Sequence, residues 1–171
     1  MRTLSLLRHA KSSWTDPTES DHERPLNPRG KRDAPGMGRF MRDHGLVPDL
    51  VLCSDSVRTR ETMKLVLAEW GDRAPETRLD AALYLAEPNR ILKVVGKVDA
   101  GVGHCLVIGH NPGLHALALA LADTGEPQAL SDLSARFPTA ALAVFDLKTE
   151  SWSKVGPSTG RLRLFVTPRR L

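Results

Sequence analysis

The sequence predicts a three-layer α/β fold with a mainly parallel central sheet and helices on both faces. Short aliphatic segments of strand length recur at residues 3–7, 49–54 and 105–108, and such continuous apolar runs are typical of strands buried on both faces. Helix-start signals or amphipathic segments follow them, and strands that alternate with helices form parallel sheets. The length of 171 residues indicates one domain over residues 1–171.

Capping residues define the first expected helix. Asn27 and Pro28 form a typical helix start, with asparagine as N-cap and proline in the first turn. The helix should end at Gly45, because glycine favours the conformation that terminates helices. Pro35 inside this segment predicts a kink or a break. The polar, proline-containing segment 10–27 before it should form a loop beside the end of the first strand.

The later elements follow from apolar spacing and from further capping residues. In chain order they are a helix over 56–70, a mixed segment over 71–87, a helix over 88–98, and two strands over 140–147 and 162–167. The two late strands should form a hairpin-like or edge pair around Trp152. Asn111 and Pro112 should cap a further helix, which is apolar on nearly all sides.

Composition predicts a cytoplasmic protein that does not enter a membrane. Hydrophobic residues make up 41% and charged residues 26% of the chain, which are ordinary values for a globular protein. No apolar run approaches the roughly 18 residues of a membrane span, and the start of the chain lacks the features of a signal peptide. Cys53 and Cys105 each lie in an apolar run, so they are expected to be buried free thiols.

The net charge of +4 comes from the end of the chain. The last eleven residues contain four arginines and no acid, and the rest of the chain holds 20 basic and 20 acidic residues. A local basic tail is not the extended positive surface that nucleic-acid binding requires. No nucleic-acid partner is therefore expected.

Polar side chains with a common chemistry follow the three buried strands. Arg8 and His9 end the first strand, Arg58 comes shortly after the second, and His110 comes directly after the third. Open α/β sheets bind ligands outside the carboxyl ends of their strands, so these side chains should meet at one edge. Arginine forks match phosphate oxygens, and helix N-termini favour anions. The sequence therefore predicts a phosphate pocket.

Two histidines beside two arginines indicate nucleophilic catalysis rather than a metal site. Guanidinium groups repel a cation, and the motifs hold no nearby carboxylate, so neither a metal nor another cofactor is expected. Nearby positive charge lowers the pKa of a histidine, and a neutral imidazole that faces a phosphoryl group is a nucleophile. We expect activity to survive an excess of EDTA. Loss of activity that a divalent ion restores would contradict this prediction.

Three motifs together resemble the histidine phosphatase superfamily, which includes the phosphoglycerate mutases. They are Leu-Arg-His-Ala-Lys-Ser at 7–12, the Ser54–Thr62 run, and Val-Ile-Gly-His-Asn-Pro at 107–112. The Arg-Pro-Leu-Asn run at 24–27 is similar to the SixA branch, the phosphohistidine phosphatases of bacterial phosphorelays. The resemblance implies a phosphoglycerate mutase-like fold and a site that needs no metal.

The resemblance also implies roles for individual residues. His9 would be the nucleophile, Arg8 and Arg58 would bind the phosphoryl group, and His110 would stabilise the transition state. Arg24 matches a substrate-side arginine of the SixA branch. Ser12 and Asn111 complete the expected substrate-binding set. The usual Arg-His-Gly motif has alanine here, at Ala10.

No residue stands out as the general acid, although Asp21, Glu23 and Glu87 are candidates. An alkoxide is a poor leaving group, close to hydroxide with its conjugate-acid pKa of about 15.7, and needs an acid. An imidazole, whose protonated form has a pKa of about 6.5, leaves far more easily. A weak acid site therefore favours a P–N substrate over a phosphoester.

The leading hypothesis is a metal-independent phosphatase that acts through a covalent phosphohistidine intermediate on phosphohistidine in a phosphorelay protein. One alternative is a small-molecule phosphomonoesterase that uses the same site. An alternative of another class is a non-catalytic module that binds phosphoproteins. The partner would be a phosphorylated protein or a small phosphoester, and the sequence does not predict an oligomeric state.

Overall fold

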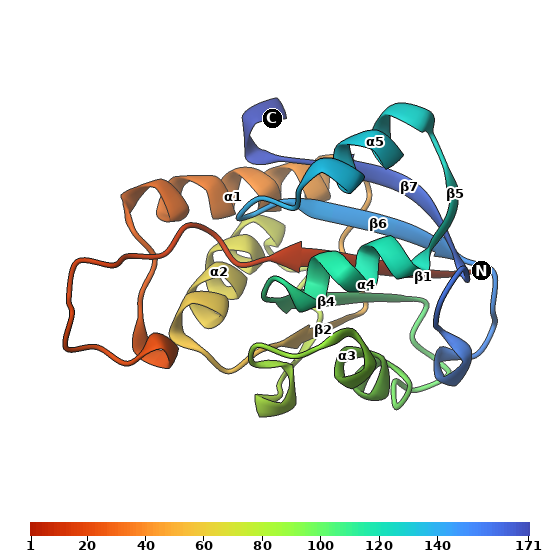
Figure 1. Ribbon diagram of the computed structural model, residues 1–171, viewed down its shortest axis with the longest axis horizontal. Coiled ribbons are helices and arrows are strands. Elements are labelled where there is room, and N and C mark those ends of the chain that lie inside the picture. The colour runs from red at the N-terminus through yellow and green to blue at the C-terminus, as the bar shows by residue number, and fades with distance from the viewer.

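The computed structural model of the protein describes residues 1–171. Its middle layer is one seven-stranded sheet in the order β3-β2-β4-β1-β6-β7-β5 (Figure 1). The strands are β1 (Arg2–Arg8), β2 (Leu50–Cys53), β3 (Glu76–Leu79), β4 (His104–Gly109), β5 (Ala122–Gly125), β6 (Leu142–Leu147) and β7 (Gly160–Val166). β4 pairs in parallel with β1 on one side and with β2 on the other. The three predicted buried strands therefore end at the same edge of the sheet.

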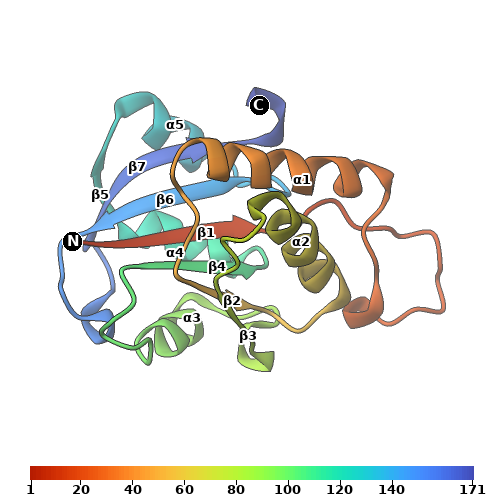
Figure 2. The ribbon, with the colours of Figure 1, turned by 180° about the vertical axis from the view of Figure 1, so that it is seen from behind.

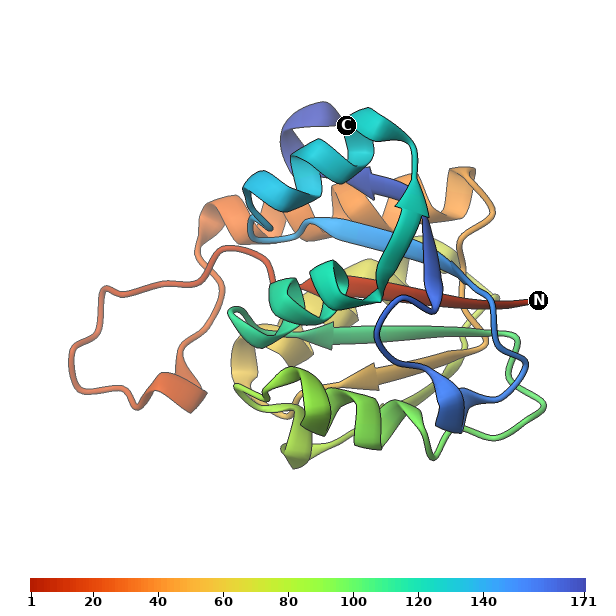
Figure 3. The same cartoon turned by 45° about the vertical axis from the view of Figure 1, so that its right-hand side comes forward.

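Helices cover both faces of the sheet, which confirms the predicted fold class. They are α1 (Pro28–Asp43), α2 (Val57–Leu67), α3 (Pro88–Val95), α4 (Gly113–Leu121) and α5 (Pro127–Ala135). α1 and α2 cover one face, where Met37 and Val66 join a core that includes Leu7 of β1 (Figure 2). α3, α4 and α5 cover the other face, where Leu114 joins a core with Leu4 (Figure 3). None of these helices is long and apolar enough to cross a membrane.

Helix α1 is unbroken, so the predicted break at Pro35 is wrong. The side chain of Asn27 caps the helix by accepting a hydrogen bond from the Gly30 N–H at 2.9 Å. A proline inside a helix costs about 3 kcal/mol or more, and packing against α2 offsets that cost. A Cβ at Gly38 would lie 2.7 Å from the Val66 carbonyl oxygen, so only glycine allows this close approach. Gly45 follows the helix with a φ of +67°, as a terminating glycine should.

Three elements have no counterpart in the sequence prediction. Three of the four β3 side chains are exposed, and β5 is a short outer strand that pairs with β7 alone. Neither strand carries an apolar pattern, because an outer strand buries few side chains. Helix α5 follows β5 and is capped by the side chain of Glu126. β6 and β7 form the predicted antiparallel pair, but they are not at the edge, because β5 lies outside β7.

Candidate active site

Strand β1 places Arg8 and His9 at the carboxyl edge of the parallel strands. The backbone N–H of His9 donates to the Gly109 carbonyl at 3.1 Å, which ties the strand tip to β4. On the other side, the Ala140 N–H donates to the carbonyl oxygens of Arg8 and His9, at 3.1 and 3.0 Å. Backbone hydrogen bonds on both sides therefore hold the end of the strand in place. The loop of residues 10–27 leaves from this tip and projects beyond the sheet (Figure 3).

His9 is buried in a form that suits a nucleophile. Its Nδ1 lies 2.8 Å from the Ala10 carbonyl oxygen. A carbonyl can only accept a hydrogen bond, so Nδ1 carries the hydrogen and Nε2 keeps a free lone pair. Burial lowers the pKa of His9 to about 3, and the positive charges of Arg58 and Arg8 also lower it. The imidazole is therefore neutral near pH 7.

His110 faces His9 across the site, with ring centroids 5.4 Å apart. Its Nε2 lies 2.8 Å from the Ser54 hydroxyl, which comes from the end of β2. Tyr84 contacts the same imidazole edge-on, at a centroid distance of 5.3 Å. Burial and the charge of Arg58 lower the pKa of His110 to about 4. Two neutral imidazoles thus stand next to two guanidinium groups.

The two arginines of the site each retain unused hydrogen-bonding capacity. Arg8 donates through Nη1 to the Phe137 carbonyl at 3.1 Å, and Arg58 donates through Nη1 to the Asp21 carbonyl at 2.7 Å. The Nε atoms of both arginines and Nδ1 of His110 are buried without a hydrogen-bond partner. Burial and the neighbouring Arg58 lower the pKa of Arg8. Unpaired donors and repelling positive charges together favour the binding of an anion.

Asp21 is the carboxylate that joins the arginines of the site. Its side chain forms ion pairs with Arg58 at 3.0 Å and with Arg24 at 3.1 Å, and it accepts a hydrogen bond from the Tyr84 hydroxyl. Burial alone would raise the pKa of Asp21, but the hydrogen bonds from Tyr84 and Arg58 lower it to about 2. Asp21 is therefore ionised near pH 7 and fixes the orientation of Arg58.

Arg24 lies at the base of the projecting loop. It is buried, and its Nη1 donates to the Ser12 hydroxyl at 2.8 Å and to the Ser13 carbonyl at 3.1 Å. The ring of Trp14, a side chain that is 72% exposed, lies 3.4 Å from the guanidinium carbon. The expected substrate-side residues Arg24 and Ser12 thus contact each other, and Asp21 connects them to Arg58.

The other expected residues are less tightly integrated. The side-chain NH₂ of Asn111 donates to the Phe137 carbonyl at 2.8 Å. Asn111 therefore does not cap α4, which begins after Pro112 without a side-chain cap. Glu87 is exposed at the start of α3, and Glu23 bonds to His22 at 3.2 Å. The site thus brings together every expected residue except Glu23 and Glu87, for which no contact with the two imidazoles is seen.

Three participants were not predicted as site residues. Ser54 directly follows β2 and bonds to His110, Tyr84 bonds to Asp21, and the Phe137 carbonyl accepts from both Arg8 and Asn111. The position of Ser54 after a buried strand was the available signal. Tyr84 is the only tyrosine of the chain, but it lies in a segment without a repeating pattern. A backbone carbonyl such as that of Phe137 leaves no trace in the residue type.

The remaining charged groups lie outside this site. Arg161 and Arg163 pair with Asp146, and Arg170 pairs with Asp132 at 2.6 Å. Two acids from other elements thus pair with three of the four arginines of the basic tail. No group of three or more His, Cys, Asp or Glu side chains is arranged to hold a metal ion.

Comparisons with known proteins agree with this geometry. A family model described as histidine phosphatase superfamily, branch 1, matches residues 4–84. An uncharacterized protein of Mycobacterium tuberculosis is 38% identical over 165 residues, which cover 95% of this chain and 100% of the relative.

Two solved structures are also similar. A provisionally named phosphohistidine phosphatase SixA from Nakamurella multipartitia superposes with a TM-score of 0.84 at 30% identity, covering 98% of this chain and 96% of the other. A provisionally named SixA from Agrobacterium tumefaciens gives 0.82 at 28% identity, with 98% of each chain covered.

Proposed function

The chain is a phosphatase of the histidine phosphatase superfamily, in its SixA-type branch, and from this premise we propose that it dephosphorylates phosphohistidine in a protein. His9 is the proposed nucleophile, Arg8 and Arg58 bind the phosphoryl oxygens, and His110 stabilises the transition state. Arg24, Ser12 and Asn111 complete and position the phosphate-binding side of the pocket.

One observation carries the proposal: a neutral, buried histidine with a free Nε2 faces unpaired donors. The buried side-chain donors without a partner include Arg8 Nε and Arg58 Nε, and both belong to residues around His9. Unsatisfied buried donors are rare in proteins because each costs about 1–3 kcal/mol. A phosphoryl group held against His9 offers oxygens that would satisfy such donors.

The proposed reaction has two steps. Nε2 of His9 attacks phosphorus, a P–N bond to His9 forms, and the P–N bond of the substrate breaks. The leaving imidazole nitrogen of the substrate takes up a proton. That proton comes from solvent. Water then attacks phosphorus and releases a proton to solvent, which balances the first transfer. The P–N bond to His9 breaks, inorganic phosphate leaves, and Nε2 of His9 regains its lone pair. The arginines stabilise the negative charge on the phosphoryl oxygens in both steps.

The environment of the carboxylates favours this P–N substrate. With a pKa of about 2, Asp21 holds no proton to donate at neutral pH, so it is proposed as a positioning residue. Of the other candidate acids, Glu23 bonds to His22, and Glu87 is exposed and makes no side-chain hydrogen bond or ion pair. A leaving imidazole needs less protonation than an alkoxide, because its conjugate acid is far stronger.

A substrate panel tests the proposed function. It consists of an aryl phosphate, sugar phosphates, 3-phosphoglycerate and a phosphohistidine-containing domain. We expect the phosphohistidine domain to give the highest kcat/KM. A sugar phosphate or 3-phosphoglycerate that gives a higher kcat/KM would identify a small-molecule phosphomonoesterase instead. Binding of the phosphorylated domain without turnover of any compound would identify a binding module.

Replacing Arg24 by alanine should slow the aryl phosphate and the phosphohistidine domain alike. A charge-assisted hydrogen bond contributes about 1.5–3 kcal/mol, so kcat/KM should fall roughly ten- to a hundredfold. Arg29→Ala is the matched control, because Arg29 is exposed and pairs only with Asp33. Unchanged kcat/KM for both substrates would show that Arg24 does not act on the phosphoryl group. A fall for the protein substrate alone would place Arg24 on the partner protein.

A further inference from the structure

Three unpaired cations lie along α3 and the turn that follows it. Arg90, Lys93 and Lys97 have spacings of three and four residues, which bring side chains to one side of a helix. None of the three forms an ion pair, whereas the neighbouring Arg78 pairs with Glu76 at 2.7 Å. This side of α3 therefore carries positive charge that no acid of the chain neutralises.

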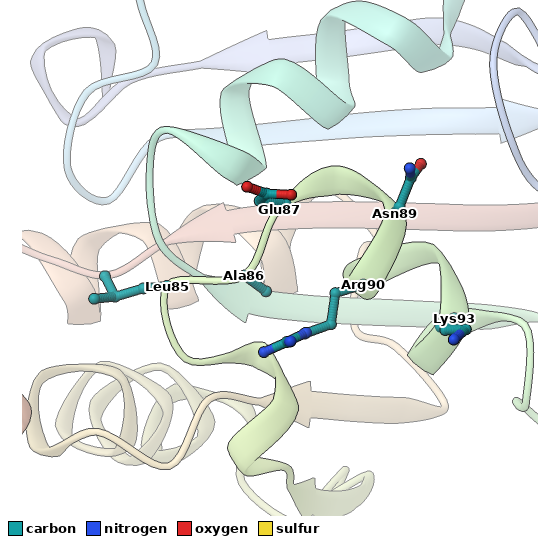
Figure 4. Close-up of a pocket in the computed structure, with 6 residues that line it drawn as sticks. All are labelled: Leu85, Ala86, Glu87, Asn89, Arg90 and Lys93. Carbon is teal, nitrogen blue, oxygen red and sulfur yellow. The ribbon is translucent and has the colours of Figure 1, made fainter.

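These cations line a continuous groove. One cavity of about 680 Å³ is lined by Leu85, Arg90 and Lys93 among others, and Figure 4 shows its lining residues. A second cavity of about 510 Å³ shares Arg90 and Lys93 and adds Leu79 and Lys97. Because Arg90 and Lys93 line both cavities, the two cavities form one surface. We call this surface the α3 groove and define it by Leu79, Leu85, Arg90, Lys93 and Lys97. Glu87 also lines the first cavity, but its side chain points away from that of Arg90 (Figure 4). Asp80 lines the second cavity, where its carboxylate accepts from the Ala82 N–H at 2.8 Å and forms no ion pair with the three cations.

The α3 groove also exposes two large apolar side chains. Leu79 and Leu85 are each 51% exposed. Leu85 has a φ of +48°, in the left-handed region that favours glycine and costs other residues roughly 1–2 kcal/mol. A leucine that is both strained and exposed is not explained by packing. Such positions occur where a side chain serves binding.

The groove begins at the wall of the catalytic site. Leu85 directly follows Tyr84, which contacts His110 and bonds to Asp21. The next residue, Ala86, packs against the start of α4, because a Cβ at Gly113 would lie only 1.7 Å from the Ala86 carbonyl oxygen. The end of the groove at Leu85 is therefore fixed relative to His110. A ligand that lies in the groove would extend from this end away from the candidate active site.

We propose that the α3 groove docks an acidic segment of the phosphorylated protein substrate, whose carboxylates face the three cations and whose apolar side chains contact the two leucines. This inference rests on the proposed function and adds a surface for recognising the partner. Charge complementarity is the argument for this occupant. Two exposed leucines, set apart along the groove, match a protein segment better than a small anion.

Two synthetic peptides with a central phosphohistidine test the docking surface. Leucines and glutamates flank the phosphohistidine in the first peptide, and glutamine replaces every glutamate in the second. At low ionic strength the wild-type enzyme should favour the acidic peptide in kcat/KM by roughly tenfold or more, since complementary charge accelerates association. The preference should disappear near 1 M salt, where the screening length falls to about 3 Å.

Charge reversal locates the effect. The double variant R90E/K93E should lose the preference for the acidic peptide. It should hydrolyse both peptides equally well or favour the neutral peptide. The control K64E/R73E makes the same change in net charge with exposed residues that form no ion pair. Lys64 lies on α2 and Arg73 bonds back to Trp70, on the face of the sheet opposite α3, so this variant should keep the preference. Equal melting temperatures check that both variants fold.

The outcomes separate the docking surface from the proposed function. Equal hydrolysis of both peptides by the wild type, or a preference retained by R90E/K93E, would overturn the docking surface alone. Hydrolysis of neither peptide, with the aryl phosphate still hydrolysed, would overturn the phosphohistidine substrate and the docking surface together.

Discussion

Replacing His9 by alanine should lower kcat by roughly four orders of magnitude or more, as expected when the nucleophile of a covalent mechanism is lost. His110 is not expected to replace it, because its ring bonds through Nε2 to Ser54 and lies 5.4 Å from that of His9 between centroids. Steady-state kinetics with the aryl phosphate and the phosphohistidine domain measure the loss. The fold should persist, since the imidazole bonds only to the neighbouring Ala10 carbonyl.

The covalent intermediate gives a second measurement for the same variant. Wild-type enzyme quenched during turnover should carry phosphate that is lost in acid and retained in alkali, and His9→Ala should carry none. His44→Ala is a suitable control, because His44 is exposed at the end of α1. A His9→Ala enzyme that retains several per cent of wild-type activity would contradict covalent catalysis through this residue.

Replacing Arg58 by alanine should reduce kcat/KM by about 10²- to 10³-fold, the effect of losing one preorganised charge-stabilising donor. Arg58 is buried, and its Nε is one of the donors without a partner. Arg58→Lys should recover only part of the activity, because an ammonium group does not provide the planar fork of a guanidinium.

The neighbouring Arg60 gives the matched control. It lies two residues further along α2 and is exposed, so Arg60→Ala should leave kcat/KM within twofold of the wild type. Thermal unfolding should accompany the kinetics, because Arg58→Ala leaves Asp21 without one of its ion-pair partners. An Arg58→Ala enzyme within tenfold of wild-type kcat/KM, with an unchanged melting temperature, would remove Arg58 from the phosphoryl site.

The carboxyl edge that holds the candidate site was predictable because its strands contain unbroken runs of buried residues. Four consecutive residues of β1, all four of β2 and the last five of β4 are buried, and most of them are aliphatic. Such short apolar runs give a clear strand signal in a sequence. Polar residues directly after such strands must lie at the carboxyl edge of a parallel sheet. The places of Arg8, His9 and His110 in the sequence, directly after buried strands, therefore predicted that they lie close together in the structure.

What escaped prediction depends on contacts that residue type does not encode. The Phe137 carbonyl holds Arg8 and Asn111 through backbone chemistry that any residue could supply. Strand β3 belongs to the sheet through backbone hydrogen bonds, while three of its four side chains face solvent. Pro35 shows the reverse case, in which a strong local signal was overridden by the packing of α1 on α2.

Because β6 pairs with β1, residues that follow the family motifs are needed to complete the candidate site. All the motifs that mark the family precede residue 113, yet β6 pairs along the free side of β1 and the preceding loop supplies the Phe137 carbonyl to Arg8. A fragment that stopped after α4 would keep every signature residue but leave one side of its nucleophile strand unpaired and prone to aggregation. A fragment of this chain that ends after α4 should therefore lack stable phosphatase activity.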